Sequence, residues 1–406
     1  MKVLFIVTAY PRHDADVITP WMGETIQRLI ASGTSVEVLA PSYRGSRTAM
    51  TGGVKVHRFR YAPSRLETLT HDMPAMERIR RNPAFAALLP AYIAAGIKAA
   101  GRVAAHGKFD VVHAFWPIPH GLFGIAAKQA SRAALVSTFF SAELMWKGTT
   151  RRAMAPVVRK VVEASDAVTV ISGYTGQRLR EYAPDAATVT IPFGAAAADD
   201  RQVALGDTRR PRSASDPFEL LFVGRLVERK GVDVLIRAAA ILRDDPRLTI
   251  RIVGAGPEMA SLEKQALSMG LDGRVVFEGM VSAEAIVGHF ARCDALVLPA
   301  VITASGDTEG LGVVLIEAMG YGKPVIASAA GGIVDIVSDG ETGLLVAPGD
   351  ADALAGAIRR AMDDPDEMRR LAGRGTTFAA RAFGWNTIVT ALSAVYESAV
   401  AARSGS

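Results

Sequence analysis

Residues 220–242 read LLFVGRLVERKGVDVLIRAAAIL, and this stretch decides the fold class. The apolar residues 220–223 predict a buried strand, and the run over 232–242 predicts a helix. Residues 224–231 between them form a turn bounded by glycines, and three of its residues are basic. Strand–turn–helix units of this kind build parallel sheets, which bind ligands at the carboxyl ends of their strands. The stretch therefore predicts an α/β fold with a ligand site beside this turn.

The same alternation extends in both directions and predicts two sheets. Strands are predicted at 2–8, 35–40, 111–114, 135–138, 167–171 and 188–191, and again at 219–223, 249–253, 274–277, 295–298, 324–327 and 343–346. Helices are predicted at 21–32 and 154–163, and a last helix from Trp385 to Val400 precedes a loose tail at 401–406. The pattern fails from Ala195 to Pro217, and 406 residues exceed what one core usually supports. We therefore expect a Rossmann-like domain at 1–198, a linker at 199–217, a second Rossmann-like domain at 218–384, and a C-terminal segment at 385–406 that crosses back to the first domain.

Composition excludes several classes of protein. Hydrophobic residues make up 50% of the chain and charged residues 21%, which is typical of a globular protein and not of a disordered one. The single cysteine, Cys293, cannot form an internal disulfide, and we interpret it as a small buried side chain before a strand. Residues 1–8 are apolar but too short for a signal peptide, so they predict a first strand. We therefore expect a cytoplasmic protein.

The longest apolar stretch, residues 84–105, predicts an ordinary packed helix. Pro90, Lys98 and Arg102 interrupt it and alanine dominates it, whereas a transmembrane span needs a longer run of large aliphatic residues.

Charge differs strongly between the two halves of the chain. Residues 1–198 contain 24 basic and 13 acidic residues, a net charge of +11, whereas residues 199–406 carry −6. Three arginines, Arg78, Arg80 and Arg81, precede the apolar stretch. This asymmetry favours contact of the first half with something anionic, such as the phospholipid surface at the inner face of the membrane, a lipid phosphate or an acidic acceptor, and a solvated basic surface is the alternative. We expect no nucleic-acid partner.

The turn after residue 223 has the chemistry of a diphosphate site. Gly224 allows close backbone approach, and Arg225 and Lys230 can neutralise phosphates, Arg225 as a fork and Lys230 as a point charge. Two solvated cations are the alternative interpretation.

A second strand ends in Gly254-Ala255-Gly256-Pro257-Glu258 before a helix. Gly254 and Gly256 let a ligand approach the backbone and the amino end of that helix. The third glycine of the dinucleotide fingerprint is missing, so a nicotinamide or flavin enzyme is disfavoured and we expect no cofactor.

The segment 307–319, DTEGLGVVLIEAM, supplies two carboxylates eight positions apart. A helix beginning near Gly312 places Glu317 about one turn inside, while Glu309 stays in the preceding loop. Gly310, Leu311 and Gly312 then border the ligand, and the positive helix end faces phosphate. Carboxylates are good acceptors for vicinal diols, so Glu309 suits sugar hydroxyls and Glu317 suits ribose hydroxyls.

These motifs give the chain a resemblance to the retaining GT-B glycosyltransferases of glycosyltransferase family 4. The resemblance covers almost the whole length and is densest over 220–348, where GRLVERKG matches a diphosphate-binding segment and Glu309 to Glu317 match an E-x7-E motif. It implies two Rossmann-like domains whose parallel sheets face each other across a cleft. It also implies that Arg225 and Lys230 contact the donor diphosphate, Glu309 the donor sugar and Glu317 the ribose. Catalysis without a bound metal is implied too, since these cations can stabilise the leaving group.

The first half departs from the family pattern. Residues 111–121, VVHAFWPIPHG, resemble a His-Ala-His-Trp segment in which Phe115 replaces a histidine, and Phe140 stands where many members carry another. His120 or Glu143 could compensate on the acceptor side, whereas His113 is interpreted as structural.

The first loop, Tyr10 to Asp16, replaces a Gly-Gly pair of the family and includes Arg12 and His13. We expect it to line the acceptor side, because similar loops occur in members that build cell-surface polysaccharides or glycolipids.

The predicted function is retaining transfer of a hexosyl group from a nucleoside diphosphate sugar to an acceptor hydroxyl, in glycolipid, polysaccharide or secondary-metabolite glycoside synthesis. Two alternatives remain. One is a sugar-nucleotide epimerase or a phosphorylase on the same fold, and the other is a non-catalytic nucleotide-sugar-binding protein.

Overall fold

The computed structural model describes residues 1–14, 16, 18–73, 75–194 and 213–404. The chain divides into two compact units, Met1–Ile191 with Val389–Ser406, and Pro192–Ile388. Most of the predicted linker at 199–217 lies outside the described residues, which resume at residue 213.

The first unit is built on an eight-stranded sheet in the order β3-β4-β2-β1-β5-β6-β7-β8. Every described neighbouring pair is parallel except β3 and β4, which are antiparallel. The central strands are buried and read as apolar runs, as expected when both faces of a parallel sheet are covered. The strands are β1 Lys2–Ile6, β2 Ser35–Pro41, β3 Ala49–Thr51, β4 Val54–Phe59, β5 Val111–Phe115, β6 Ala134–Phe139, β7 Ala167–Val170 and β8 Val189–Thr190.

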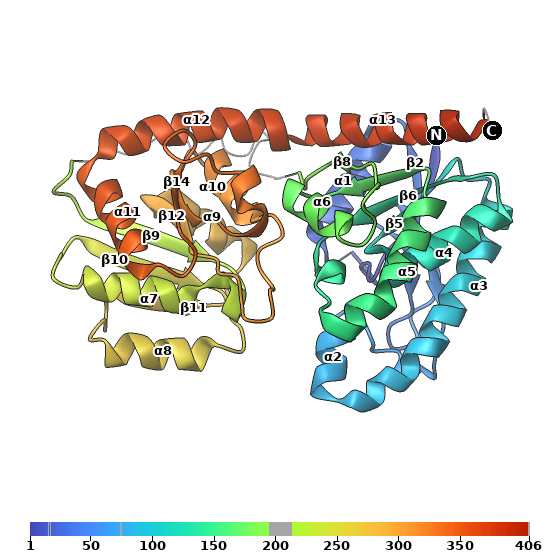
Figure 1. Cartoon of the computed structure of the whole chain (residues 1–406), viewed down its shortest axis with the longest axis horizontal. Coiled ribbons are helices and arrows are strands. Elements are labelled where there is room, and N and C mark those ends of the chain that lie inside the picture. The colour runs from blue at the N-terminus through green and yellow to red at the C-terminus, as the bar shows by residue number, and fades with distance from the viewer. Residues whose placement is uncertain (15, 17, 74, 195–212, 405–406) are drawn as a thin grey trace. The chain divides into compact units, whose positions relative to one another are not determined.

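Helices cover both faces of this sheet. Figure 1 shows α1 on one side and α3, α4 and α5 on the other, as right-handed crossovers require when the strand order runs outward in both directions from β1. The described helices are α1 Pro20–Ala31, α2 Ala75–Arg81, α3 Leu89–Gly107, α4 Pro117–Ala130, α5 Gly148–Ala164 and α6 Gly173–Arg180, with short 3-10 turns η1 Ser64–Leu66, η2 Pro83–Leu88 and η3 Ala142–Leu144.

The apolar stretch predicted at 84–105 is η2 followed by α3. Pro90 lies in the first turn of α3, where a missing N–H costs little. One face of α3 packs against α4, and a Cβ at Gly96 would lie 2.3 Å from the Phe123 ring. One face of α3 is therefore packed as expected, but only 17% of the most apolar window of Pro83–Gly107 is buried, so most of this segment is not covered by the protein.

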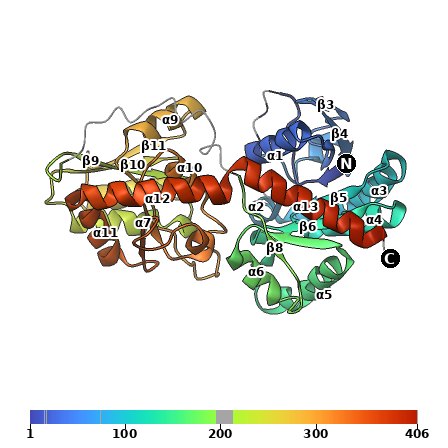
Figure 2. The ribbon, with the colours of Figure 1, turned by 90° about the horizontal axis from the view of Figure 1, so that it is seen from above.

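The C-terminal helix α13, Trp385–Ser404, belongs to the first unit from Val389 onward. In Figure 2 its C-terminal part lies across the strands of the first sheet. The buried Tyr396 hydroxyl lies 2.8 Å from His113 Nδ1, and Arg403 donates to the Lys128 carbonyl at 3.2 Å. The predicted tail was therefore wrong for residues 401–404, because they continue this helix.

The second unit has a six-stranded parallel sheet in the order β11-β10-β9-β12-β13-β14. The chain order reverses between β9 and β12, which makes their carboxyl ends the topological switch point. The strands are β9 Phe218–Val223, β10 Leu248–Val253, β11 Val275–Gly279, β12 Ala295–Leu298, β13 Val325–Ser328 and β14 Leu344–Val346.

Helices also sandwich this sheet, with α7 and α8 on one face and α10 and α12 on the other (Figure 1). The described helices are α7 Val232–Ile241, α8 Met259–Ser268, α9 Ala283–Arg292, α10 Val313–Gly320, α11 Ala351–Asp363 and α12 Pro365–Phe383, with 3-10 turns η6 Glu228–Lys230 and η7 Gly331–Asp335. Cys293 is completely buried directly before β12, as predicted.

The strand predictions agree with the structure to within two residues at each end. Two strands were missed, β3 and β4, which form a hairpin around Gly52 and Gly53. The helix predicted at 154–163 begins earlier, at Gly148, since Thr149 to Arg151 extend α5 toward its amino end without an apolar pattern.

Candidate functional site

A buried ion pair lies at the switch point of the second sheet. Lys230 ends η6 after β9, and Glu309 lies in the loop after β12. Their Nζ and Oε2 atoms are 2.5 Å apart, and the side chains are only 13% and 14% exposed. Burial raises the pKa of Glu309, but the Lys230 ammonium opposes this effect and the net pKa lies below its usual value. Glu309 is therefore ionised and held toward Lys230.

Glu317 is the second carboxylate of this site, and it lies on α10 one turn after Gly312. Its side chain is half-buried, and burial raises its pKa to about 7 even though Lys230 lowers it. Because Lys230 acts on both carboxyl groups, its ammonium lies within electrostatic reach of each. The structure thus brings together the three residues that the sequence analysis assigned to sugar, ribose and phosphate.

Glycines let the loops of this edge pack backbone to backbone. A Cβ at Gly254 would lie 1.9 Å from the Gly224 carbonyl oxygen, and one at Gly256 would lie 2.1 Å from the Leu226 oxygen. At Gly231 a Cβ would come within 1.9 Å of the Pro299 oxygen. Contacts under 3.0 Å do not occur for real Cβ atoms, so these positions require glycine. The loops after β9, β10 and β12 therefore form one continuous backbone surface.

Two further glycines of the site were missed by the sequence analysis. A Cβ at Gly331 would lie 2.0 Å from the Glu309 oxygen, and one at Gly332 would lie 2.1 Å from the Gly310 oxygen. The Gly332 N–H also donates to the Glu309 carbonyl at 2.9 Å. The signal was present, since this Gly-Gly pair follows the predicted strand at 324–327. It positions the backbone of the Glu309 loop.

The amino end of α10 opens onto this loop. Gly312 is the N-cap, with φ of 91°, and Leu311 beside it is 2% exposed. Gly312 adopts a left-handed conformation that glycine tolerates and most residues do not. The helix dipole consequently directs partial positive charge toward the space beside Glu309.

Two arginines border the same edge. Arg225 is exposed directly after β9, whereas Arg229 forms an ion pair with Asp307 at 3.4 Å. The Arg229 carbonyl accepts the Val301 N–H at 2.9 Å, which ties η6 to the loop after β12. Arg225 is therefore exposed at this edge, and Arg229 supports the loop.

Aromatic side chains occupy the corresponding edge of the first sheet. Trp116 stacks on Phe140 with ring centroids 4.3 Å apart, and Trp21 lies 5.7 Å from Phe140 and 5.8 Å from Trp116. Trp116 has φ of 50° and Ser141 has φ of 83°, which are strained values for residues other than glycine. Phe115 and Phe140 thus replace two family histidines with part of a packed aromatic cluster.

The predicted acceptor-side residues His120 and Glu143 are both buried. His120 is 1% exposed, and its ring nitrogens contact Tyr92 Oη at 3.0 Å and the Phe115 carbonyl at 2.8 Å. Burial lowers its pKa to about 4. The structure therefore places His120 in the core, with both nitrogens engaged by the protein.

Glu143 occupies a different environment, at the carboxyl end of β6. Its Oε1 accepts the Phe140 N–H at 2.9 Å, while its Oε2 is buried and has no hydrogen-bond partner among the described residues. Burial raises the pKa of this carboxyl to about 7.

Arg12 and His13 lie in the first loop, and both are exposed. Arg12 Nε lies 2.6 Å from Asp16 Oδ2, and the Arg12 guanidinium lies 5.2 Å from the centre of the Tyr43 ring. His71 also contacts Asp16, at 3.1 Å, and stacks on Tyr43. The structure thus fixes Arg12 within a polar cluster and leaves His13 at the surface, and the assignment of both to an acceptor stays a prediction.

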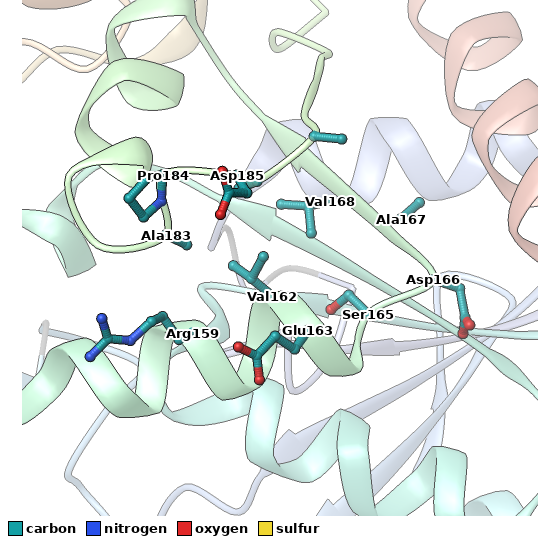
Figure 3. Close-up of a pocket in the computed structure, with 12 residues that line it drawn as sticks. Arg159, Val162, Glu163, Ser165, Asp166, Ala167, Val168, Ala183, Pro184 and Asp185 are labelled. Carbon is teal, nitrogen blue, oxygen red and sulfur yellow. The ribbon is translucent and has the colours of Figure 1, made fainter.

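A cavity of about 370 Å³ lies elsewhere, between α5 and the segment before β8 (Figure 3). Arg159 and Glu163 of α5 line it, together with Asp166 and Ala167 at the amino end of β7. Ligand sites of α/β sheets occur at the opposite, carboxyl ends of strands. This cavity is therefore not the candidate site.

Comparison with known proteins agrees with this geometry. Residues 207–377 match the family described as "Glycosyl transferases group 1", and residues 18–194 match the "Glycosyl transferase 4-like domain". Together the two matches cover most of the chain.

Curated relatives and solved structures match along the full length. The chain is 30% identical to glycogen synthase of Mycobacterium tuberculosis over 98% of this chain and 94% of that protein. It is 27% identical to GDP-mannose-dependent alpha-(1-6)-phosphatidylinositol monomannoside mannosyltransferase of the same species, over 96% of this chain and 97% of that protein.

Among solved structures, sucrose-phosphate synthase of Thermosynechococcus elongatus superposes with a TM-score of 0.74 at 25% identity, covering 99% of each chain. HepE of Anabaena, in complex with UDP, superposes with a TM-score of 0.71 at 21% identity, covering 98% of this chain and 100% of that one. The chain therefore belongs to glycosyltransferase family 4 and is a hexosyltransferase of GT-B fold that uses a sugar nucleotide.

Proposed function

We propose that this hexosyltransferase retains the anomeric configuration of the donor sugar and acts without a bound metal. The observation that carries the proposal is the placement of Lys230, which pairs with Glu309 and lies within electrostatic reach of Glu317. A cation that pairs with one carboxylate and acts electrostatically on a second suits a ligand that carries both phosphate and diol groups.

The donor half of the reaction follows from these side chains. Negative charge grows on the diphosphate as its bond to the anomeric carbon breaks, and the Lys230 ammonium and Arg225 guanidinium stabilise that charge. Glu309 accepts hydrogen bonds from sugar hydroxyls, and Glu317 accepts them from the ribose when it is ionised. Contacts that strengthen as charge develops lower the barrier to transfer.

Retention requires the new bond to form on the face that the diphosphate leaves. In the proposed step the acceptor oxygen attacks the anomeric carbon from that face, while the carbon–oxygen bond to the diphosphate breaks. The acceptor proton passes to the departing phosphate oxygen, so no enzyme nucleophile is needed. The charge at Arg225 and Lys230 favours this route, because it stabilises the leaving diphosphate before the new bond is complete.

Metal independence is supported by the cations and by two aspartates. Asp14 and Asp16 have the D-x-D spacing of metal-binding pairs, as do Asp350 with Asp352 and Asp364 with Asp366, although Asp350 and Asp364 cap the amino ends of α11 and α12. Asp14 Oδ1 accepts the Gly52 N–H at 2.8 Å, and Asp16 pairs with Arg12 and His71. Both carboxylates therefore serve the protein itself, and undiminished transfer in the presence of EDTA is the expected result.

A lipid-linked or polymeric acceptor is the proposed substrate class. The relatives include proteins named for phosphatidylinositol monomannoside, which is a glycolipid, and for glycogen, which is a polysaccharide, and these two names support this class. Another relative is named for D-inositol 3-phosphate, a small polyol, which makes a soluble acceptor the alternative.

The basic first unit supports contact with the cytoplasmic face of a membrane. Arg80 and Arg81 of α2 are exposed, and Met76 beside them is 62% exposed. The following segment, Pro83–Gly107, is long and apolar enough to cross a membrane by length and composition, and only 17% of its most apolar window is buried. An exposed basic and apolar surface of this kind suits an interface with anionic lipid.

Donor identification is the first experiment. Thermal shifts with UDP, GDP, ADP and their sugars select the base, and NMR of the product with a sugar or polyol acceptor reads the anomeric configuration. An inverted product would overturn retention. Incubation with donor alone separates the alternatives, since an epimerase changes the sugar without any acceptor and a phosphorylase requires free phosphate.

Co-sedimentation with vesicles tests the membrane proposal. Vesicles rich in phosphatidylglycerol should bind the protein at low salt, and the R80Q/R81Q variant should bind more weakly. The R152Q/R359Q variant removes the same charge from exposed positions outside α2, and it should bind like the parent. Absence of binding at low salt would overturn the proposal.

A further inference from the structure

A basic groove lies on the outer side of the second unit, between α12 and the loop before β14. Its volume is about 720 Å³. Loop residues 338, 341 and 342 form one side, and α12 forms the other. The lining residues are Ser338, Glu341, Thr342, Arg369, Arg370, Gly373, Arg374, Thr377, Phe378 and Arg381. Four arginines therefore face one carboxylate, in a half of the chain whose net charge is −6.

Helix geometry aligns most of these groups. Arg370, Arg374, Thr377 and Arg381 are spaced by four, three and four residues, so they share one face of α12. At 1.5 Å per residue, the three arginines extend over about 16 Å. The opposite face of α12 is buried through residues such as Leu371, which fixes the orientation of the basic face. The cations therefore form a line rather than a single point of charge.

Two of the arginines carry no ion pair with any described residue, namely Arg374 and Arg381, and both are exposed. Arg369 pairs with Asp366 at 2.6 Å, but these side chains are 58% and 85% exposed, and exposed ion pairs of this kind contribute little free energy. Arg370 lies 3.4 Å from Glu367, whose side chain is only 15% exposed and pairs more closely with Arg360, at 2.6 Å. An anionic ligand can therefore recruit Arg374 and Arg381 without breaking any of these pairs.

We propose that this α12 groove is a binding site for a soluble anion with two or more phosphate groups. Arginine forks match phosphate oxygens in pairs, and the exposed Ser338 hydroxyl adds a donor. A row of about 16 Å suits several phosphates along one molecule better than a single phosphate. The only large apolar group of the lining, Phe378, is half-buried, so the groove lacks the exposed apolar surface that favours a membrane.

The groove is separate from the donor site. Thr342 directly precedes β14, at the amino ends of the parallel strands, whereas Lys230 and Glu309 lie at their carboxyl ends. It is nevertheless connected to the donor helix α10. The Thr376 hydroxyl of α12 donates to the Met319 carbonyl at 2.7 Å, two residues after Glu317. An occupied groove should therefore change donor affinity, and the donor should change ligand affinity by the same factor.

Titration with inorganic triphosphate tests the binding site. The R225A/K230A variant weakens the donor site, so triphosphate that still binds reports the groove. Adding R374Q/R381Q to this variant should raise the Kd at least tenfold, whereas adding R152Q/R359Q should change it less than twofold. No binding to the R225A/K230A variant, or equal binding after R374Q/R381Q, would overturn the proposal. Circular dichroism melts check that each variant folds.

Two further measurements complete the test. Vesicles of phosphatidylglycerol should bind the parent and the R374Q/R381Q variant equally, and a loss confined to vesicles would assign the groove to a membrane instead. Donor KM is then measured against triphosphate in the parent and in R374Q/R381Q. Triphosphate competes with the donor at the donor site of both proteins, so a difference between their dependences of donor KM on triphosphate concentration comes from the groove. Different dependences support coupling between the groove and the donor site, and identical dependences refute it.

Discussion

The carboxyl edges of the two parallel sheets are built from opposite kinds of side chain. In the second unit the edge consists of glycine-lined backbone around the ionised pair of Lys230 and Glu309. In the first unit it consists of stacked aromatic rings, including Trp116 on Phe140, beside the buried Glu143. The same position in two related folds can thus serve a charged ligand or exclude charge, and the side chains decide which.

The two edges also differ in what offsets the unfavourable desolvation of a buried carboxyl group. Glu309 is compensated by an ammonium 2.5 Å away, so it stays ionised. Glu143 accepts the backbone N–H of Phe140, but burial outweighs the backbone donors and raises its pKa to about 7. A buried charge without a partner is expensive, which is why burial alone moves such a group toward its neutral form.

The largest expected effect tests the charged edge directly. Replacing Lys230 with alanine removes the cation that neutralises the leaving diphosphate, so kcat/KM should fall by about 10²- to 10³-fold. Arg225→Ala should act in the same direction. Steady-state transfer assays measure both, with Lys264→Ala, an exposed lysine on α8, as the matched control. Near-normal transfer by Lys230→Ala would show that this edge is not the donor site.

Glycine replacement tests whether the backbone surface of that edge is required. Gly254→Ala forces a Cβ to within 1.9 Å of the Gly224 oxygen at φ of 132°, so the two loops must separate. We expect a loss of about 1–3 kcal/mol in the free energy of unfolding and at least tenfold weaker donor binding. Gly356→Ala is the control, because open space surrounds that exposed helical glycine. Alanine there should raise the free energy of unfolding by about 0.5–1 kcal/mol. Equal melting of both variants would contradict the close packing.

The aromatic edge is tested through Glu143. Its folded pKa of about 7 exceeds the ordinary value of 4.5, so the folded protein binds this proton more tightly than the unfolded chain. Its contribution is favourable at low pH and is lost as pH rises from about 4.5 to 7. Glu143→Gln should therefore unfold with up to about 3 kcal/mol more free energy than the parent at pH 8, and with little gain at pH 5.

Denaturant titrations at both pH values measure this difference. Glu163→Gln, an exposed carboxyl on α5, should change the free energy of unfolding by less than about 0.5 kcal/mol at either pH. A Glu143→Gln variant that is destabilised at pH 8 would reveal an ionised and compensated carboxylate, and the contrast between the edges would fail.

The smallest expected effect concerns Glu317, whose raised pKa resembles that of Glu143 although it lies on the charged edge. Only the ionised carboxylate accepts hydrogen bonds from both ribose hydroxyls, so donor affinity should fall as pH drops from 8 to 6. The pKa of Glu309 is lowered, so that group stays ionised across this window.

Donor titrations by calorimetry at several pH values follow this effect. Glu317→Gln should weaken binding at pH 8 about tenfold and flatten the pH dependence. Glu263→Gln, exposed on α8, should keep the parental profile. A pH dependence that survives in Glu317→Gln would assign the titration to another group.

Local sequence was sufficient for the two segments of the candidate site. Strand, turn and helix follow one another within residues 220–242, and Glu309 and Glu317 lie eight positions apart at a loop and the helix after it, so the spacing predicts that each segment follows the carboxyl end of a strand. The missed pair Gly331 and Gly332 shows the limit, because the need for glycine there comes from the Glu309 loop, about twenty residues away in sequence.

The acceptor-side predictions depended on packing that no local pattern contains. The sequence predicted His120 as an acceptor-side residue, yet it is buried and its Nε2 lies 3.0 Å from the hydroxyl of Tyr92 on α3. His113 contacts Tyr396, which lies 283 residues further along the chain. Burial and partners of this kind arise only when distant elements meet.

The sequence by itself determined two α/β series, the strand–turn–helix of residues 220–242 and the spacing of Glu309 and Glu317, because these follow from the residue pattern along one strand or helix. Only the tertiary structure decided that Lys230 pairs with Glu309, that Glu317 and Glu143 have raised pKa values, and that His113 and His120 lie in the core of the first unit. The reason is physical: spacing sets the direction of a side chain, whereas burial and charge depend on which other parts of the chain pack around it.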